Sequence, residues 1–395
     1  MKILVVCQYY YPEPFRISDI CETLVGKGHD VTVLTGLPNY PEGQVLEGYR
    51  HGRKRNEVLN GVKVIRSFEI GRGNNKLKLF LNYFSFAVSG SLKALFMNEK
   101  FDVVLVNQLS PVMMGIPAIV YKKKHKTKVL LYCLDLWPDS LAAGGIKESS
   151  MIYKFFMKLS KWIYNSADSI AVTSSMFKEY FRSTLGEYKK EIHHLPQYAE
   201  DLFSESIEVP KNDKYNFVFA GNIGDMQSVE TIVKAANELC KHSDITFHIV
   251  GDGSKLEECK MLSQKMKLDN IIYYGRRPVS EMPYYYALAD AMLITLKNNK
   301  AISYTLPGKV QSYMAARKPI IGAINGEASH VIRESGCGFC CAAENYKELA
   351  NLILEFCNSD KKEEMAIRSY DYYIRNFSKE RFISLLEKKL TDLGI

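Results

Sequence analysis

A short segment, Leu306-Pro307-Gly308-Lys309, has the residue types of a phosphate-binding turn. It follows an apolar run at 292–296 that suits a buried strand, and it opens a helical pattern with Val310, Tyr313 and Met314 on one face. The first turn of a helix presents unpaired backbone N–H groups and the positive end of the helix dipole. Lys309 adds a full charge there, so the segment suits a phosphate group. A solvated lysine on an ordinary crossover explains the same residues equally well.

Three more turns in the second half follow strand patterns. Phe219-Ala220-Gly221-Asn222-Ile223-Gly224 and Val250-Gly251-Asp252-Gly253 contain glycines, and Gly275-Arg276-Arg277-Pro278 supplies guanidinium donors. Each turn alone is weak evidence, because such turns often only allow compact geometry. In one sheet they predict a nucleotide-diphosphate pocket. The residues expected to line it are Gly221, Asn222, Gly251, Gly253, Arg276, Pro307, Gly308 and Lys309.

The loop at 8–16, after the first strand pattern, carries aromatic residues, one carboxylate (Glu13) and one arginine. A dinucleotide-binding dehydrogenase would have GxGxxG here, so a nicotinamide oxidoreductase is disfavoured. A second loop, at 35–41, ends the neighbouring strand, and both lie where ligands bind in open α/β sheets. The two loops suit a sugar or lipid-phosphate ligand, with ordinary loop packing as the alternative. The contact residues that we predict are Tyr10, Arg16, Asn39 and Tyr40.

Asp135 follows the fully apolar strand pattern at 129–133. A carboxylate at that strand end could position a hydroxyl group or act as a base. Capping of the following turn is the competing interpretation. We therefore take Asp135, with Glu13 and Lys309, as the candidate catalytic residues.

The elements that must position these residues alternate regularly along the chain. A parallel α/β architecture in two domains follows from this alternation and from the length of 395 residues. We predict domains at 1–196 and 215–375, a linker at 197–214 and a returning C-terminal helix at 376–395. Strand patterns lie at 3–7, 31–35, 62–65, 103–106, 129–133, 169–173, 216–220, 246–250, 270–274, 291–296 and 320–324.

The net charge of +8 is concentrated in the first half of the chain. Residues 1–195 hold 27 lysines and arginines against 17 aspartates and glutamates, whereas the rest hold 25 against 27. Such asymmetry indicates a polyanionic partner. The segment 79–97 is broken by polar residues and falls short of a membrane span, so we expect a buried helix or, second, interfacial insertion. Together with the basic-aromatic pattern at 154–164, the charge favours peripheral contact with an anionic membrane surface.

Several functional classes are disfavoured. No metal is expected, because Cys337, Cys340 and Cys341 have no second cysteine or histidine pair at ligand spacing. The N-terminus is too short and too soon interrupted for a signal peptide, and it suits a first strand. The scattered cysteines suit buried free thiols in a reducing cytosol, so we expect a cytoplasmic protein. Nucleic acid is an unlikely partner, because the basic half lacks a nucleic-acid-binding module.

The order FxGNIG, VGDG, YYGRRP, TLPGKVQSYMAARKPII and NGE resembles family 4 glycosyltransferases of the GT-B fold. YYPEPFR, GHDVTVLTGLPNYPEG and DLWPDS resemble the capsule and O-antigen subgroup, above all N-acetyl-L-fucosaminyl transferases. The resemblance implies two facing Rossmann-like domains with parallel sheets, and C-terminal helices that cross back to the first domain. The donor would bind the second domain and the acceptor the first. Gly308 and Lys309 would clamp the leaving diphosphate, and Glu327 would bind hydroxyl groups of the ribose or sugar.

The implied activity is that of a retaining, metal-independent hexosyltransferase at the inner face of the cell membrane. It would move an N-acetylated deoxyhexosamine from a UDP-sugar to a polyprenyl-diphosphate-linked saccharide. The chain lacks the E-x7-E carboxylates of most relatives, with Tyr304 and Ser312 in their places. A nucleotide-sugar 2-epimerase and a non-catalytic sugar-nucleotide-binding component of an assembly complex are the alternatives.

Overall fold

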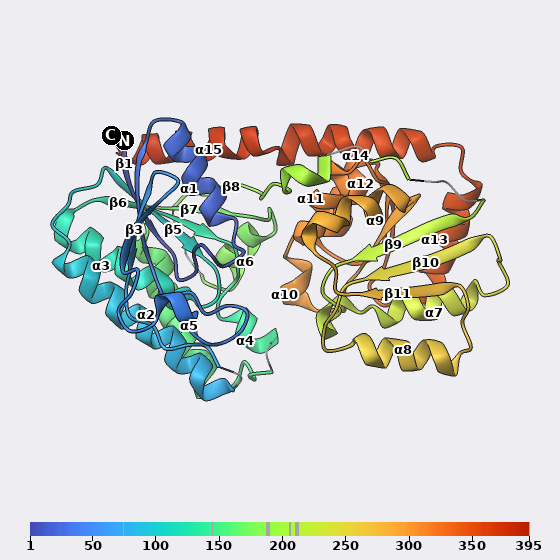
Figure 1. The fold of residues 1–395 in the computed structure, drawn as a ribbon, viewed down its shortest axis with the longest axis horizontal. Helices are drawn as coiled ribbons and strands as arrows, with labels where there is room; N and C mark the ends of the chain where they lie inside the picture. The colour runs from blue at the N-terminus through green and yellow to red at the C-terminus, as the bar shows by residue number, and fades with distance from the viewer. Residues whose placement is uncertain (74, 144, 187–189, 205–206, 210–212, 395) are drawn as a thin grey trace. The chain divides into compact units, whose positions relative to one another are not determined.

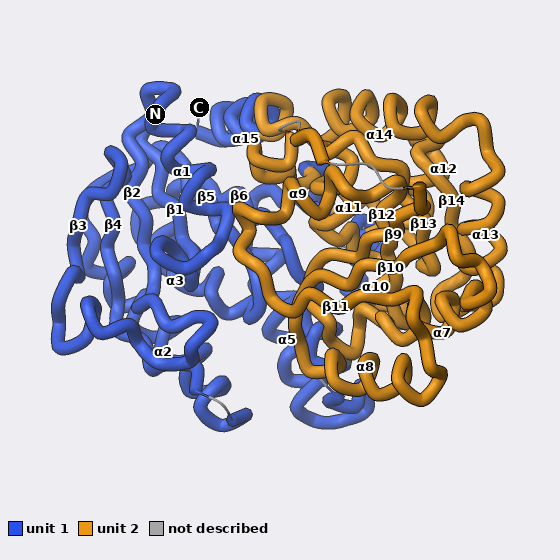
Figure 2. The backbone as a smooth tube through the Cα atoms, turned by 45° about the vertical axis from the view of Figure 1, so that its right-hand side comes forward, with its two compact units in different colours: residues 1–173, 177–195, 383–395 blue, residues 174–176, 196–382 orange. Residues whose placement is uncertain are grey.

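The computed structural model describes residues 1–73, 75–143, 145–186, 190–204, 207–209 and 213–394, which form two compact units. Figure 2 shows unit 1 (1–173, 177–195 and 383–395) and unit 2 (174–176 and 196–382) in different colours. The division after residue 195 lies next to the predicted domain end at 196. The parallel α/β architecture predicted for both halves is present (Figure 1).

Two predicted boundaries in unit 2 differ from the structure. The returning segment was expected from residue 376, but residues up to 382 belong to unit 2 because Phe377 and Phe382 are buried, the former in the core of that unit. The start of the predicted linker is also packed, since Ala199 and Phe203 belong to the same core. Apolar side chains that bury against a sheet override a local sequence that lacks periodicity.

Unit 1 contains an eight-stranded sheet in the order β3-β4-β2-β1-β5-β6-β7-β8, parallel except for the antiparallel pair β3–β4. The central strands are buried on both faces, which explains their continuous apolar sequences. The strand order reverses between the neighbouring strands β1 and β5. The loops that follow these two strands therefore diverge and leave room for a ligand. The strands are β1 Lys2–Val6, β2 Asp30–Thr35, β3 Asn56–Leu59, β4 Val62–Arg66, β5 Val103–Gln108, β6 Lys128–Cys133, β7 Ser169–Val172 and β8 Ile192–His194.

Helices cover this sheet, and α3 contacts both α2 and α5. The predicted burial of α2 is wrong for most of the helix. One side packs through residues such as Phe86 and Gly90, while apolar side chains on the rest of the helix are exposed. The helices of the first half are α1 Ile17–Gly26, α2 Lys76–Phe96, α3 Ile116–His125, α4 Asp139–Ala143, α5 Met151–Ser166 and α6 Phe177–Ser183.

Unit 2 contains a six-stranded parallel sheet in the order β11-β10-β9-β12-β13-β14. The strand order reverses between β9 and β12, so the loops after these two strands lie at the topological switch point. The strands are β9 Tyr215–Ala220, β10 Ile245–Val250, β11 Ile271–Gly275, β12 Ala291–Thr295, β13 Ile320–Ala323 and β14 Gly338–Cys341. The helices are α7 Glu230–Glu238, α8 Leu256–Lys265, α9 Met282–Leu288, α10 Lys300–Ser303, α11 Gly308–Ala315, α12 Glu327–Ser335, α13 Tyr346–Asn358, α14 Lys362–Phe377 and α15 Lys379–Gly394.

Three strands were not predicted from the sequence: β3, β8 and β14. They are short, and each forms an edge of its sheet. Edge strands bury little apolar surface, so their sequences carry only a weak strand pattern. Every strand that was predicted is present, with ends that differ by one or two residues.

Candidate functional site

Lys309 occupies the centre of the predicted diphosphate site in unit 2. It is the second residue of α11, and its Nζ lies 3.9 Å from the ring centroid of Phe219, the residue before the last of β9. Among the residues that the structure describes, this buried Nζ has no hydrogen-bond partner. Burial lowers the pKa of Lys309 to about 7. An ammonium group held this way lacks a counter-charge, which an anion could supply.

The glycine turns above Lys309 are packed backbone against backbone. Gly221 has φ 143° and covers the ammonium, since a Cβ there would lie 3.1 Å from Lys309 Nζ. A Cβ at Gly251 would lie only 1.8 Å from the Gly221 carbonyl oxygen, so the turn after β10 can touch the turn after β9 only with glycine at this position. Tyr313 braces the same point, because its hydroxyl accepts from the Ala220 N–H and donates to the Ala220 carbonyl. The structure thus brings Gly221, Gly251 and Lys309 together.

The other predicted donor residues occupy different environments. Asn222 is exposed, and its Nδ2 donates to Gln227 Oε1 at 3.1 Å. Gly253 belongs to the same packed turns, because a Cβ there would lie 2.5 Å from the Ile223 carbonyl oxygen. Arg276 is exposed after β11, the edge strand, with β10 between it and β9. Pro307 is the N-cap residue of α11, and Gly308 is its first residue. The first backbone N–H groups of α11 therefore have no acceptor within the helix.

Glu327, predicted to bind hydroxyl groups, is buried at the start of α12. Its carboxylate accepts from Ser175 Oγ at 2.7 Å, from the Ser175 N–H at 3.0 Å and from the Met176 N–H at 3.3 Å. Both carboxylate oxygens therefore hold the 174–176 segment in unit 2. Contact with a ligand hydroxyl would require a rearrangement of these bonds. No local sequence pattern predicts these contacts, because Glu327 lies 152 residues from Ser175 and 151 residues from Met176 along the chain.

Glu13 joins the two loops predicted as the acceptor site in unit 1. Its carboxylate accepts from the backbone N–H groups of Asn39 at 2.9 Å, Tyr40 at 2.8 Å and Tyr10 at 3.1 Å. Burial raises the pKa of Glu13 to about 7, although these N–H groups oppose the change. The structure therefore shows Glu13 as the link between the loops after β1 and β2.

Asp135 lies after β6 and also contacts the neighbouring loop. Its Oδ2 accepts from both the N–H and the Oγ of Ser110, each at 3.0 Å, and Trp137 Nε1 donates to the same Ser110 Oγ at 2.9 Å. Burial raises the pKa of Asp135, and the bonds from Ser110 oppose this. The Asp135 side chain thus holds the loop after β5 through Ser110. This contact differs from the competing interpretation, in which Asp135 caps the turn that follows it.

Of the four predicted acceptor contacts, Tyr10 and Asn39 are closed off from solvent. Arg16 and Tyr40 are half-buried, with Arg16 immediately before α1. Sequence reasoning missed Glu69, a fully buried carboxyl group that follows β4 and contacts Asn39. Its place at the carboxyl end of a strand was the available signal.

Metal-binding geometry is absent from the part of the chain that the structure describes, where no three His, Cys, Asp or Glu side chains are grouped as ligands. The nine cysteines are free thiols. Burial raises the pKa of Cys337 to about 11 and that of Cys340 to about 12, so these thiols are protonated at neutral pH.

Two family models match the chain, and relatives share its sequence. Glycosyltransferase Family 4 matches residues 16–197, and Glycosyl transferases group 1 matches residues 203–371. The probable glycosyltransferase WbjE of Pseudomonas aeruginosa is 29% identical over 263 residues, 63% of this chain and 64% of the relative. The chain thus spans slightly less than two thirds of that relative. The putative colanic acid biosynthesis glycosyl transferase WcaI of Escherichia coli (strain K12) is 24% identical over 336 residues, 80% of this chain and 81% of the relative.

The crystal structure of HepE from Anabaena in complex with UDP has the same fold, with a TM-score of 0.74, 13% identity and 100% of both chains covered. This likeness confirms the predicted GT-B fold class. The two family models together account for both halves of the sequence. The N-terminal half of the chain is therefore similar to family 4 glycosyltransferases, and the C-terminal half to group 1 glycosyl transferases.

Proposed function

We propose that the protein is a glycosyltransferase whose unit 2 binds a UDP-sugar donor. The observation that carries this proposal is the buried Nζ of Lys309, which has no hydrogen-bond partner among the described residues and lies beneath Gly221 at the start of α11. A diphosphate would supply the missing negative charge and could accept hydrogen bonds from the first amide groups of the helix. UDP as the nucleotide is supported by HepE, a protein of the same fold whose structure contains UDP.

The chemical step would need stabilisation of the diphosphate as it leaves the sugar. Negative charge develops on its oxygens, and preorganised donors act most strongly on charge that develops in a site shielded from water. Lys309 and the amide groups of Gly308 and Lys309 would serve in this role, and the proposal requires no metal. We propose retention of the anomeric configuration, in line with the resemblance described above.

The proposed transferred sugar is an N-acetylated deoxyhexosamine, N-acetyl-L-fucosamine first, and the proposed acceptor is a polyprenyl-diphosphate-linked saccharide. The motifs YYPEPFR and DLWPDS, which resemble the capsule and O-antigen subgroup, support this choice. WcaI, named for colanic acid biosynthesis, also supports a role in bacterial polysaccharide synthesis. The acceptor would bind unit 1.

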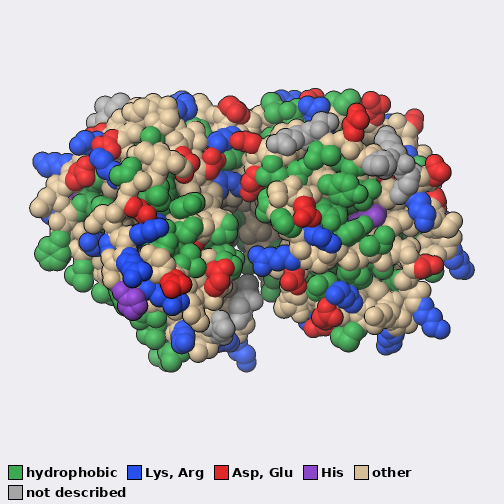
Figure 3. All heavy atoms as spheres, in the orientation of Figure 1, with side chains coloured by type: hydrophobic (Ala, Val, Ile, Leu, Met, Phe, Trp, Pro, Cys, Tyr) green, Lys and Arg blue, Asp and Glu red, His purple; other side chains and the backbone are tan. Residues whose placement is uncertain are grey.

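A lipid-linked acceptor implies contact with a membrane, for which unit 1 offers a surface. We call the exposed sides of α2 and α5 the membrane-docking face. Each of α2, α3 and α5 contains three lysines and no aspartate or glutamate. Figure 3 shows hydrophobic and basic side chains intermingled on the lower part of this unit. The exposed apolar residues of the face are Leu77, Phe80, Leu81, Val88, Leu92, Leu95, Phe96, Met151, Ile152, Phe155 and Trp162.

By length and composition, helix α2 could cross a membrane, so the expectation that this segment falls short of a span is wrong. Its packed side nevertheless includes Asn82, a fully buried residue whose amide group donates to Glu69. Withdrawal of the helix into lipid would break this bond and expose the core that Phe86 fills. We therefore propose that α2 lies along the surface of the membrane, with the lysines attracting anionic lipid. The expected location is the cytoplasmic face of the cell membrane.

Release of UDP from purified protein tests the proposed activity. The assay combines a panel of UDP-sugars with a short-chain polyprenyl-diphosphate-linked N-acetylglucosamine, and release should require both substrates. Lys309→Ala should lower turnover at least about tenfold, because a charge-assisted contact contributes roughly 1.5–3 kcal/mol. Lys241→Ala is the control, because this exposed lysine precedes β10 and so lies at the opposite end of the sheet.

Turnover by Lys309→Ala equal to that of the control would remove Lys309 from the site. UDP binding without transfer from any donor would instead favour the sugar-nucleotide-binding component. Absence of both UDP binding and transfer would contradict the proposed function.

A further inference from the structure

Three aromatic rings of unit 1 form a cluster at the switch point of the sheet. Tyr9 and Phe15, from the loop after β1, are stacked with ring centroids 5.0 Å apart, and Tyr40, from the loop after β2, lies 5.2 Å from Phe15. Tyr9 is buried, whereas Phe15 and Tyr40 are half-buried. We call these three residues the aromatic cluster. Partly exposed rings at such a place offer apolar surface for the face of a sugar ring.

Arg72 places a positive charge beside this cluster. Its guanidinium carbon lies 5.7 Å from the ring centroid of Tyr40. In the described part of the chain, no carboxylate lies within ion-pair distance of Arg72, and its guanidinium group donates no hydrogen bond. Arg66, by contrast, donates to Glu57 Oε1 at 2.9 Å. A guanidinium group has five N–H donors in a planar arrangement that matches a carboxylate or a phosphate.

The backbone of Arg72 is held by a buried polar network. Its N–H donates to Asn39 Oδ1 at 3.0 Å, and Asn39 Nδ2 in turn donates to Glu69 Oε1 at 3.3 Å. The same oxygen accepts from Gln8 Nε2 at 2.7 Å and from Asn82 Nδ2 at 2.6 Å. The network joins the loops after β1, β2 and β4 to helix α2. It therefore fixes the position of Arg72 relative to the aromatic cluster.

Glu69 occupies the centre of this network, and the chain leaves space for it. A Cβ at Gly36 would lie 1.6 Å from Glu69 Oε2, so glycine is required at position 36. Burial raises the pKa of Glu69 well above its usual range, and the bonds from Gln8, Asn82 and Asn39 oppose this. A fully buried carboxyl group with three amide donors on one oxygen has a structural role, which makes Glu69 a positioning residue.

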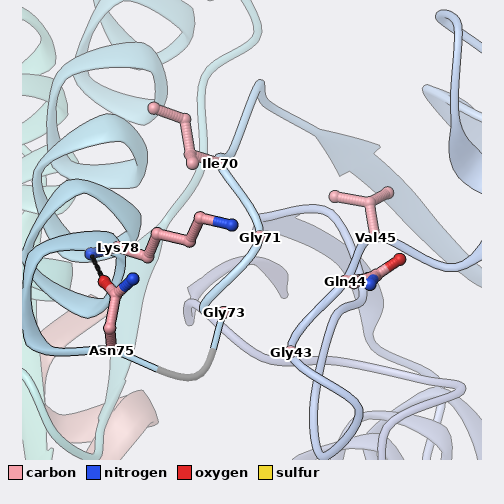
Figure 4. Close-up of a pocket in the computed structure, with 8 residues that line it drawn as sticks. All are labelled: Gly43, Gln44, Val45, Ile70, Gly71, Gly73, Asn75 and Lys78. Atoms are coloured by element: carbon pink, nitrogen blue, oxygen red, sulfur yellow. Dashed lines mark hydrogen bonds between the residues drawn. The ribbon is translucent and has the colours of Figure 1, made fainter.

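The loop that carries Arg72 also borders an open pocket of about 450 Å³. Figure 4 shows Gly71 and Gly73 on one side of it and Gly43, Gln44 and Val45 on the other, with the Lys78 side chain extending toward Gly71. Lys78 therefore places a second basic group beside the loop that carries Arg72. The space beside this loop is large enough for part of a saccharide.

We propose that Arg72 binds an anionic group of the acceptor saccharide, either a phosphate or a carboxylate, while the aromatic cluster contacts the face of the adjoining sugar ring. This inference rests on the proposed glycosyl transfer, and it defines the acceptor as negatively charged close to its sugar ring. The diphosphate of a lipid-linked saccharide and the carboxylate of a uronic acid share this chemistry. Asn39 and Glu69 hold Arg72 in place and do not touch the acceptor.

Binding to the full chain without a donor tests the proposal. The probes are a farnesyl-diphosphate-linked N-acetylglucosamine, methyl glucuronide and the neutral methyl glucoside, each measured by isothermal titration calorimetry. We expect one anionic probe to bind and Arg72→Ala to weaken its binding at least about tenfold, because a charge-assisted contact is lost. Arg53→Ala, an exposed arginine of unit 1, is the charge-matched control. The probe that binds identifies the source of the anion.

Folding and donor binding are measured on the same variants. Both tryptophans lie in unit 1, so tryptophan fluorescence reports whether Arg72→Ala leaves that unit folded. Glu69→Gln retains an oxygen for the three amide donors and should keep the affinity of the anionic probe. If neither anionic probe binds, or if Arg72→Ala and Arg53→Ala have equal affinity for the probe that does, the inference is overturned. UDP affinity is independent of this result, so its loss would contradict the proposed function instead.

Discussion

Lys309 shows how its surroundings define the chemistry of a residue. On a helix surface its ammonium group would be hydrated and charged, whereas beneath Gly221 it is buried against the ring of Phe219. Burial lowers the pKa of Lys309 to about 7, because the charged form loses water without gaining a partner. An anion in the site would restore the charged form. Ligand binding and protonation of Lys309 are therefore linked.

Proton uptake on UDP binding is the expected consequence. Above pH 7 the Lys309 amine of the unliganded protein is largely neutral, so bound diphosphate must draw a proton onto it; below pH 7 the proton is already present. UDP affinity should consequently fall as the pH rises above about 7, by at most about tenfold per pH unit. Calorimetry at pH 8 in two buffers of different ionisation enthalpy measures the uptake. Lys309→Met should abolish it, and an equal uptake by that variant would contradict the linkage.

At the scale of an element, α2 has two chemically different sides. Asn82, Phe86 and Gly90 pack against unit 1, while the apolar side chains of the membrane-docking face are exposed. The polar residues that interrupt its apolar sequence are therefore no evidence against lipid contact, because several of them lie on the packed side. Lysines near the exposed apolar side chains are typical of a helix at a membrane surface.

Charged residues on the membrane-docking face should weaken vesicle binding. We expect the protein to sediment with phosphatidylglycerol-containing vesicles at low salt, less at high salt, and poorly with pure phosphatidylcholine. The double variant Leu92→Glu and Phe155→Glu should bind at least about tenfold more weakly, because two apolar contacts are lost and negative charge is added.

Met261→Glu is the matched control, because Met261 is an exposed apolar residue on α8 of unit 2. Both replaced leucine and phenylalanine side chains are exposed, so folding should be little affected. Co-sedimentation of the double variant at the level of the control would exclude these helices as the docking surface.

At the scale of the whole molecule, the end of the chain belongs to the first unit. Residues 383–395 belong to unit 1, and Leu386 and Leu390 are fully buried. Glu387 on the same segment contacts His29 Nε2 at 2.9 Å and Lys27 Nζ at 3.0 Å. The stability of unit 1 therefore depends on residues that follow unit 2 in the sequence.

Leu390→Ala should lower the free energy of unfolding of unit 1 by about 2–5 kcal/mol, the usual cost of a buried leucine truncation. Urea denaturation followed by tryptophan fluorescence measures it, since Trp137 and Trp162 both lie in unit 1. The exposed neighbour Lys388→Ala is the control, and UDP affinity should remain unchanged in both variants. A midpoint equal to that of the control would show that this segment adds little to unit 1.

Much of the fold was accessible from local sequence. Continuous apolar runs such as β1 and β5, bounded by turns, identify strands buried on both faces without knowledge of their neighbours. The sequence Gly308-Lys309 likewise indicated a helix start suited to an anion. Asn39 and Glu13 were found as candidates because they follow strands, although their observed contacts link one loop to another.

The amino-acid sequence by itself determined the alternation of strands and helices, the two-domain division near residue 196 and the candidate loops, because these depend on residues close together along the chain. The tertiary structure decided which side chains lose water and which find partners. Three contacts join residues from different elements: Lys309 packs against Gly221, Glu327 accepts a hydrogen bond from Ser175, and Glu69 accepts one from Asn82. Burial and hydrogen bonding between distant residues set the charge and contacts of these groups, and neither can be read from neighbours in the sequence.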